Sequence, residues 1–258
     1  MNEVNVRPSQ GLLTLVLGSI VVLAWVILWY LEQSPYASLF HQHGSSSGHA
    51  HHHRLPAWLS SMTFLAGWLL MTIAMMLPTT VPLVNLFRRM LASRQQKAYL
   101  LLLLLTGYLL AWLSFGLVAL ALTRGMEQLA AGRQMLQTWI FSAGLFFLAG
   151  AFQFSKIKYA CLDMCRTPLG FLMSHWHGRN DRREAFNIGW RHGLFCIGCC
   201  WALMLLMFAV SSANLSWMLV LAFIMAIEKN ASWGRKLGRP LGVALIIAAV
   251  GICLYHLS

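Results

Sequence analysis

Three cysteines and a histidine are concentrated in one short stretch, His192-Gly-Leu-Phe-Cys196-Ile-Gly-Cys199-Cys200. If the stretch is helical, His192, Cys196 and Cys200 share one face at four-residue intervals, with Cys199 beside them and Met204 one turn further on. Thiolate, thioether and imidazole groups suit a soft metal ion such as Cu(I), and Zn²⁺ is compatible with the thiols and the histidine. The stretch therefore predicts a metal site, although cysteine and methionine also serve as ordinary packing residues.

A second cysteine pair lies about 30 residues earlier, at Cys161 and Cys165. A spacing of four residues places both thiols on one helical face. Lys158 and Arg166 flank the pair, and nearby positive charge favours the thiolate, which is both the nucleophile and the metal ligand. Pro168 is expected to stop the helix. The alternative is a basic interfacial helix with incidental thiols.

The composition indicates that the chain carrying these candidate ligands is a membrane protein. Hydrophobic residues make up 59% of the 258-residue chain and charged residues 10%, with a mean hydropathy of +0.65. A soluble domain carries about 25% charged residues. The formal net charge is +12, but the basic residues lie between apolar runs, so membrane topology explains them better than nucleic-acid binding. The expected partner is a lipid bilayer, and no nucleic acid is expected.

Seven apolar runs reach or approach the roughly 20 residues that a membrane-spanning helix needs. They cover residues 11–31, 57–77, 98–122, 136–155, 193–212, 215–229 and 241–257. The sixth run is short, so hydropathy alone leaves six spans open. The first is too long for a signal-peptide core and is expected to remain as a helix. Pro78 and Pro82 follow the second run and are expected to bend or end its helix.

The distribution of positive charge predicts an orientation. With the N-terminus inside, 16 of the 19 Lys and Arg residues fall in inner segments, which satisfies the positive-inside rule. We therefore expect an all-α, polytopic transmembrane bundle of about seven spans with its N-terminus in and its C-terminus out. The expected parts are an N-terminal segment with the first span (1–31), a His-rich outer loop (32–56) and a six-span core (57–258) with a basic inner segment at 156–192.

This topology places further candidate ligands at the depth of the cysteines. Met75 and Met76 lie at the inner end of the second span, and Glu228 lies at the inner end of the sixth. An acidic residue near a span is costly unless it has a partner, so Glu228 is a candidate metal ligand. The alternative is an ion pair with Lys229 or a neighbouring arginine, and the methionines could serve packing alone.

The outer loop is a third candidate metal-binding segment. Six histidines fall within thirteen residues, separated by Gly and Ser: His41, His43, His49, His51, His52 and His53. Such a tract is typical of metal binding, since imidazole binds Cu(II), Zn²⁺ and Ni²⁺. The loop could capture ions outside the membrane. The alternative is a disordered, pH-responsive polar loop.

Four sequence blocks together resemble a known family. They are Ala74-Met75-Met76-Leu77-Pro78, Cys161-Leu-Asp-Met-Cys165-Arg166-Thr-Pro168, the block from His192 to Met204, and Glu228-Lys229. In this order, over about residues 60–230, they resemble the bacterial predicted metal-binding integral membrane proteins (domain of unknown function 2182). The resemblance implies a multi-pass protein of the bacterial inner (cytoplasmic) membrane and suggests a metal ion, but it supplies no reaction.

The leading functional hypothesis is binding, relay or transport of a soft or borderline metal, with copper as Cu(I) or Cu(II) first and zinc second. One alternative is a membrane thiol-disulfide oxidoreductase, because Cys196-Ile-Gly-Cys199 is a C-x-x-C motif. Another is a non-catalytic accessory or assembly subunit that binds a membrane-complex partner. No phosphate-binding P-loop is evident, which argues against an ATP-driven pump, and no catalytic residues are assigned.

Overall fold

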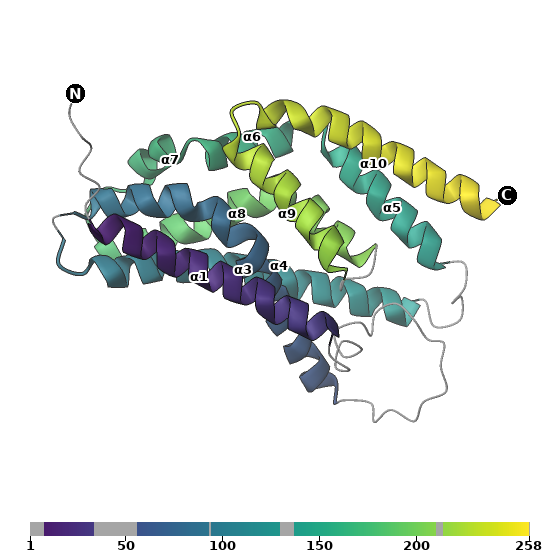
Figure 1. Cartoon of the computed structure of the whole chain (residues 1–258), viewed down its shortest axis with the longest axis horizontal. Helices are drawn as coiled ribbons and strands as arrows, with labels where there is room; N and C mark the ends of the chain where they lie inside the picture. The colour runs from purple at the N-terminus through teal and green to yellow at the C-terminus, as the bar shows by residue number, and fades with distance from the viewer. Residues whose placement is uncertain (1–7, 34–55, 93, 130–136, 210–213, 258) are drawn as a thin grey trace.

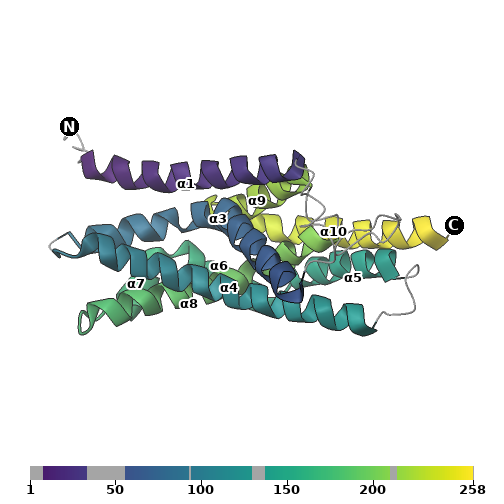
Figure 2. The ribbon, with the colours of Figure 1, turned by 90° about the horizontal axis from the view of Figure 1, so that it is seen from below.

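The computed structural model describes residues 8–33, 56–92, 94–129, 137–209 and 214–257 (Figure 1). Every regular element in these ranges is a helix, which confirms the all-α prediction for this part of the chain. The helices are α1 (Pro8–Gln33), α3 (Ala57–Met90), α4 (Lys97–Leu129), α5 (Gln137–Phe152), α6 (Lys156–Arg166), α7 (Pro168–His175), α8 (Asp181–Leu205) with a 3₁₀ turn (Leu206–Phe208), α9 (Leu215–Asn230) and α10 (Gly234–Leu257). The start of α1 and the end of α10 lie at opposite ends of the long axis (Figure 2).

Five described helices, α1, α3, α4, α8 and α10, are long and apolar enough to cross a membrane. A sixth candidate is the pair α5 and α6, which is bent by 67° at a short break. The helix α9 corresponds to the sixth apolar run but has 16 residues, fewer than a bilayer of ordinary thickness requires. The count of seven spans and the orientation therefore stay predictions.

The helix α3 does not end at the two prolines. It contains Pro78 and Pro82 and continues to Met90, beyond the apolar run that ends at residue 77, so of the two expected outcomes the prolines bend the helix and do not end it. A proline removes one backbone hydrogen bond and clashes with the preceding turn, so a helix that continues through it bends. Figure 1 shows this bend in the middle of α3, beside α9. Met75 and Met76 lie just before the bend.

The helix α8 begins twelve residues before the predicted start at residue 193. Asn180 caps it by accepting a hydrogen bond from the backbone of Arg183 at 3.3 Å. The Glu184 carboxylate accepts backbone hydrogen bonds from the preceding loop, including His177 and Gly178 at 2.8 Å. These contacts fix the first turn, as a capped helix start requires. His192 therefore lies in the interior of α8 and not at its beginning.

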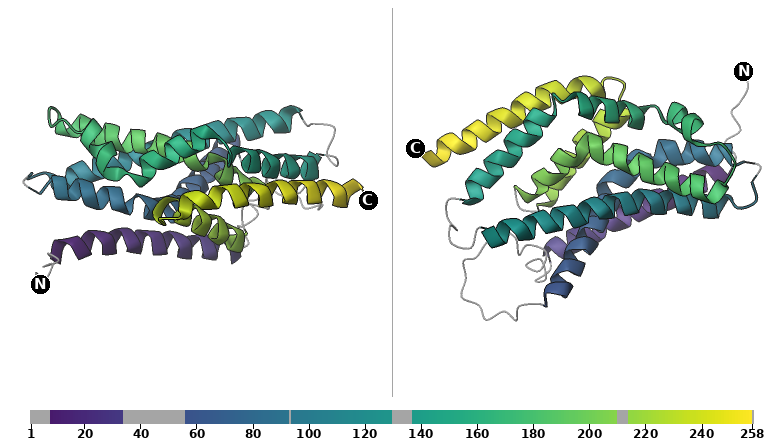
Figure 3. Two further views of the ribbon diagram at one scale, coloured as in Figure 1. Left: turned by 90° about the horizontal axis from the view of Figure 1, so that it is seen from above. Right: turned by 180° about the vertical axis from the view of Figure 1, so that it is seen from behind.

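Glycines bring α4 and α8 into backbone contact. A Cβ atom on Gly189 would collide with the carbonyl of Leu104, and one on Gly107 would collide with the carbonyl of Phe186. A Cβ on Gly193 would lie 2.6 Å from that of Ala111. Small residues allow such close approach between membrane helices. Figure 3 shows the two helices side by side, and their contact fixes the position of the cysteines that follow on α8.

Candidate metal centre

The cysteines of α8 form a buried group on one side of the helix. Cys196, Cys199 and Cys200 are each 1% exposed. The thiols of Cys199 and Cys200 donate to the carbonyl oxygen of Cys196 at 3.1 and 2.8 Å. The stretch is helical, as expected, so spacings of three and four residues bring the side chains together. The group belongs to the larger of the two buried apolar clusters of the described residues.

Met76 brings a fourth sulfur atom to this group from α3. Its Sδ lies 3.8 Å from the Sγ of Cys200, and its side chain is completely buried. Two sulfurs that share a metal ion through bonds of about 2.3 Å can be at most about 4.6 Å apart. Met75 and Met204 are also buried in the same cluster. The distance between Met76 and Cys200 is therefore compatible with a shared ion.

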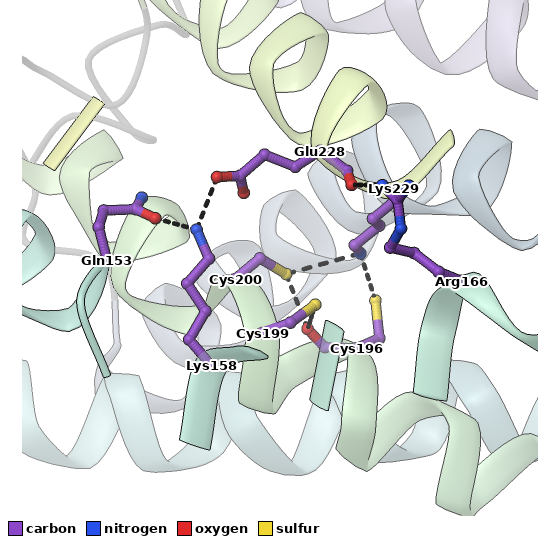
Figure 4. A network of polar contacts seen from close by, with 8 residues as sticks. All are labelled: Gln153, Lys158, Arg166, Cys196, Cys199, Cys200, Glu228 and Lys229. Atoms are coloured by element: carbon purple, nitrogen blue, oxygen red, sulfur yellow. Dashed lines mark hydrogen bonds and ion pairs between the residues drawn. The ribbon is translucent and has the colours of Figure 1, made fainter. Parts of the chain in front are cut away.

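Lys229, the next-to-last residue of α9, reaches into the middle of these sulfur atoms. Its Nζ lies 2.9 Å from the Sγ of Cys196 and 3.8 Å from the Sγ of Cys200 (Figure 4). The same nitrogen lies 3.6 Å from the Sδ of Met76. The residue is 6% exposed. From the sequence, Lys229 was considered only as a possible partner of Glu228, so its contact with the thiols was missed. The Glu228-Lys229 pair in the family-like pattern was the one signal that could have indicated it.

Glu228 points away from the thiols and pairs with a different lysine. Its carboxylate lies 2.7 Å from the Nζ of Lys158, and both side chains are buried. Lys158 also donates to the side chain of Gln153, while Arg166 donates to the backbone carbonyl of Glu228 at 2.5 Å (Figure 4). The carboxylate is thus occupied by a buried ion pair. This is the kind of pairing that the sequence left open as an alternative, with Lys158 in place of Lys229.

Two ring-bearing residues border the thiols. The hydroxyl of Tyr108 from α4 lies 3.2 Å from the Sγ of Cys196 and 3.4 Å from the carbonyl oxygen of Met76. His192 lies one turn before Cys196 and is 4% exposed, with its ring 5.9 Å from that of Tyr108 and 5.7 Å from that of Phe171. No described residue forms a hydrogen bond with the Nδ1 atom of His192. Tyr108 was not predicted, because a tyrosine in an apolar run resembles ordinary core.

The thiols of α6 approach α8 from the side. Cys165 interacts with Cys199 through its side chain. A Cβ atom on Gly198 would lie 2.6 Å from the Sγ of Cys161, so the glycine leaves room for that thiol. The helix α6 contains both cysteines and ends at Arg166, just before Pro168, as predicted. The structure therefore brings the two cysteine groups of the sequence together.

The outer-loop residues His41, His43, His49, His51, His52 and His53 lie outside the described residues. Within the described ranges, no three His, Cys, Asp or Glu side chains form a ready-made metal-binding group. The sulfur-rich set described above includes a methionine and is occupied by a lysine. Its role as a metal site stays a prediction.

Comparison with known proteins identifies the family. The profile of the PpoB2 family, described as a copper chaperone, matches residues 65–252, which include Met76, five of the six cysteines and Glu228. No curated protein and no solved structure gives a significant match. The match confirms the expectation of a copper-related family, but it does not support the name domain of unknown function 2182. The chain belongs to the PpoB2 family of copper chaperones.

Proposed function

We propose that this protein is an integral membrane copper carrier whose cargo, Cu(I), binds between Met76 of α3 and the thiols Cys196 and Cys200 of α8. The observation that carries the proposal is the 3.8 Å distance between the Cys200 and Met76 sulfur atoms in a fully buried position. Thiolate and thioether sulfur atoms select Cu(I) over hard cations. Membership of a copper chaperone family supports the same cargo.

Further sulfur atoms around this centre suit a relay. Cys199 and Cys165 form a neighbouring thiol pair that would take the ion toward α6. Buried methionines from α8, the 3₁₀ turn and α9 belong to the same apolar cluster, namely Met204, Met207, Met218 and Met225. Weak thioether ligands in series would let a monovalent ion move in small steps. In this proposal the outer histidines collect copper and the sulfur cluster holds it toward the inner face.

A membrane location is supported by the five or six helices of suitable length and apolarity. The concentration of basic residues between alternate apolar runs supports the N-in, C-out orientation. A bacterial inner membrane is the location that agrees with the sequence pattern described above.

Copper binding to purified protein tests the proposal. The wild-type protein and a Cys196→Ser/Cys199→Ser/Cys200→Ser variant would be compared in detergent under reducing conditions, with a chromogenic Cu(I) chelator as competitor. We expect the wild type to remove about one equivalent of Cu(I) from the chelator and the triple variant to remove much less. Cys253→Ser is the matched control, because Cys253 lies on α10, outside this group. Equal binding by the wild type and the triple variant would refute the proposed centre.

A thiol-disulfide oxidoreductase is a second candidate, favoured by the contact between Cys165 and Cys199 from two different helices. All six cysteines are free thiols in the structure. Mass spectrometry after alkylation would separate the two functions. A reversible Cys165–Cys199 disulfide that forms during turnover with a quinone or a dithiol partner would favour redox exchange. Thiols that stay reduced and become protected by Cu(I) would favour the carrier.

A further inference from the structure

Lys229 places a positive charge inside the proposed copper site. Its ammonium group contacts the sulfur atoms of Cys196, Cys200 and Met76 at 2.9 to 3.8 Å. Burying an ammonium is costly unless it is paired, and in a membrane bundle such a residue usually has a functional role. Here its described partners are sulfur atoms.

The nearby carboxylates are already paired with other cations. Glu228 is bound by Lys158 at 2.7 Å, and Asp163 is bound by Arg235 at 3.0 Å. Arg166 adds a further positive group at the end of α9, where it donates to the backbone carbonyl of Glu228. These carboxylates therefore do not neutralise the ammonium group of Lys229, and its positive charge contributes directly to the electrostatic energy of any ion that the sulfur atoms bind. Because the residue is buried and fixed to α9, this charge stays close to the site even if the entering ion displaces the ammonium from its present position.

The charge balance then distinguishes between metal ions of different valence. A Cu(I) ion bound by two thiolates carries a net charge of minus one, which the Lys229 ammonium neutralises. A Zn²⁺ ion bound by the same thiolates is already neutral, so the ammonium leaves an unbalanced positive charge. In a buried environment an unbalanced charge is strongly unfavourable.

Building on the proposed function, we propose that Lys229 is a specificity-determining residue that makes the sulfur site selective for monovalent soft cations over divalent ones. It does so by fixing the total charge of the site. The sulfur ligands alone would accept both Cu(I) and Zn²⁺. Lys229 therefore supplies the selectivity for Cu(I) over Zn²⁺ that the sulfur ligands alone do not provide.

The experiment compares the affinities of full-length wild type, Lys229→Met and Lys229→Arg for Cu(I) and Zn²⁺. These two ions have the same filled d shell and differ by one unit of charge, so their ratio of dissociation constants reports charge selectivity. Chelator competition in detergent under reductant gives both constants. We expect Lys229→Met to shift the ratio toward Zn²⁺ by about tenfold or more, a change of about 1.4 kcal/mol. Lys229→Arg keeps the charge and should keep the wild-type ratio within about threefold.

A matched control removes a buried lysine from the neighbouring ion pair without changing the net charge. The double variant Lys158→Met/Glu228→Gln should leave the Cu(I)/Zn²⁺ ratio unchanged, because neither side chain contacts the thiols. If Lys229→Met does not yield folded protein, Lys229→Gln removes the same charge while keeping a polar group. An unchanged ratio in the neutral variant, or an equal shift in Lys229→Arg, would overturn the inference alone. Failure of the wild type to bind Cu(I) would overturn the proposed function and the inference with it.

Discussion

The sulfur atoms of Met76 and Cys200 lie 3.8 Å apart although the two residues are 124 positions apart in the chain. The contact joins the part of α3 just before Pro78 to the last two turns of α8. The two residues supply one thioether and one thiol. Their chemistry leads to the first prediction.

Replacing Met76 with leucine should weaken Cu(I) binding without unfolding the protein. Leucine fills a similar volume, and such exchanges usually cost less than about 1.5 kcal/mol of stability. Because the thioether is lost, we expect Cu(I) affinity to fall by about 10- to 100-fold, the range found when groups that tune a metal site are removed. Chelator competition measures the change. The control is Met173→Leu on α7, where the side chain is 67% exposed, and equal affinities of the two variants would contradict the prediction.

The buried ion pair between Lys158 and Glu228 should act in stability and not in copper binding. Removing one partner leaves an unpaired buried charge, so Glu228→Gln or Lys158→Met alone should lower the free energy of unfolding by about 3–5 kcal/mol. The double variant should recover most of the loss, since no charge is then left alone. Thermal unfolding in detergent, followed by circular dichroism, measures both effects. A Glu228→Gln protein of wild-type stability that no longer binds Cu(I) would instead show Glu228 to be a ligand.

The contact between α4 and α8 should be sensitive to one methyl group. At Gly189 an added Cβ would meet the backbone of Leu104, which cannot rotate away as a side chain could. We expect Gly189→Ala to cost about 1–3 kcal/mol through overpacking. Gly144→Ala on α5 is the control, because a Cβ there meets no atom within 4 Å. Because alanine has a higher helix propensity than glycine, Gly144→Ala should leave the melting temperature unchanged or raise it slightly.

The number of spans can be decided by the location of the C-terminal end of α10. Seven spans with the N-terminus inside place Leu257 outside, whereas six spans place it in the cytoplasm. A fusion of alkaline phosphatase after Leu257 should therefore be active, and a fusion of green fluorescent protein at the same point should be dark. A second pair of fusions in the loop between α3 and α4, around Gln95, should give the opposite result. A fluorescent C-terminal fusion would show that the chain crosses an even number of times.

Much of the fold could be predicted from local patterns. The apolar runs indicate most of the helices, and the spacing of Cys196, Cys199 and Cys200 indicates their shared face. The sequence also indicates that the Cys161 and Cys165 pair lies near these thiols, because both groups fall at the inner ends of runs. The first two predictions succeed because they depend on periodicity and length, which are properties of one segment at a time, whereas the third depends on the predicted order of the spans.

What could not be predicted depends on contacts between segments. Whether Pro78 bends α3 or ends it was left open by the sequence, and in the structure the continued helix packs against α1, α4 and α9. The sequence does not determine whether Lys158 or Lys229 pairs with Glu228, since both lysines are long and basic. The outcome follows from the position of α6, which the 67° bend places beside α9. Because Lys158 of α6 pairs with Glu228, Lys229 is the cation that contacts the sulfur atoms.

The ion pair between Lys158 and Glu228 also has a consequence for how the protein is made. The lysine is synthesised 70 residues before its partner. If the chain is inserted into a bilayer as proposed, Lys158 lacks its Glu228 partner until α9 arrives, so we expect α6 to remain at the water interface while the following helices are inserted. For the proposed membrane protein we therefore expect the closure of α6 against α8 and α9, and with it the assembly of the sulfur cluster, to be a late step of folding.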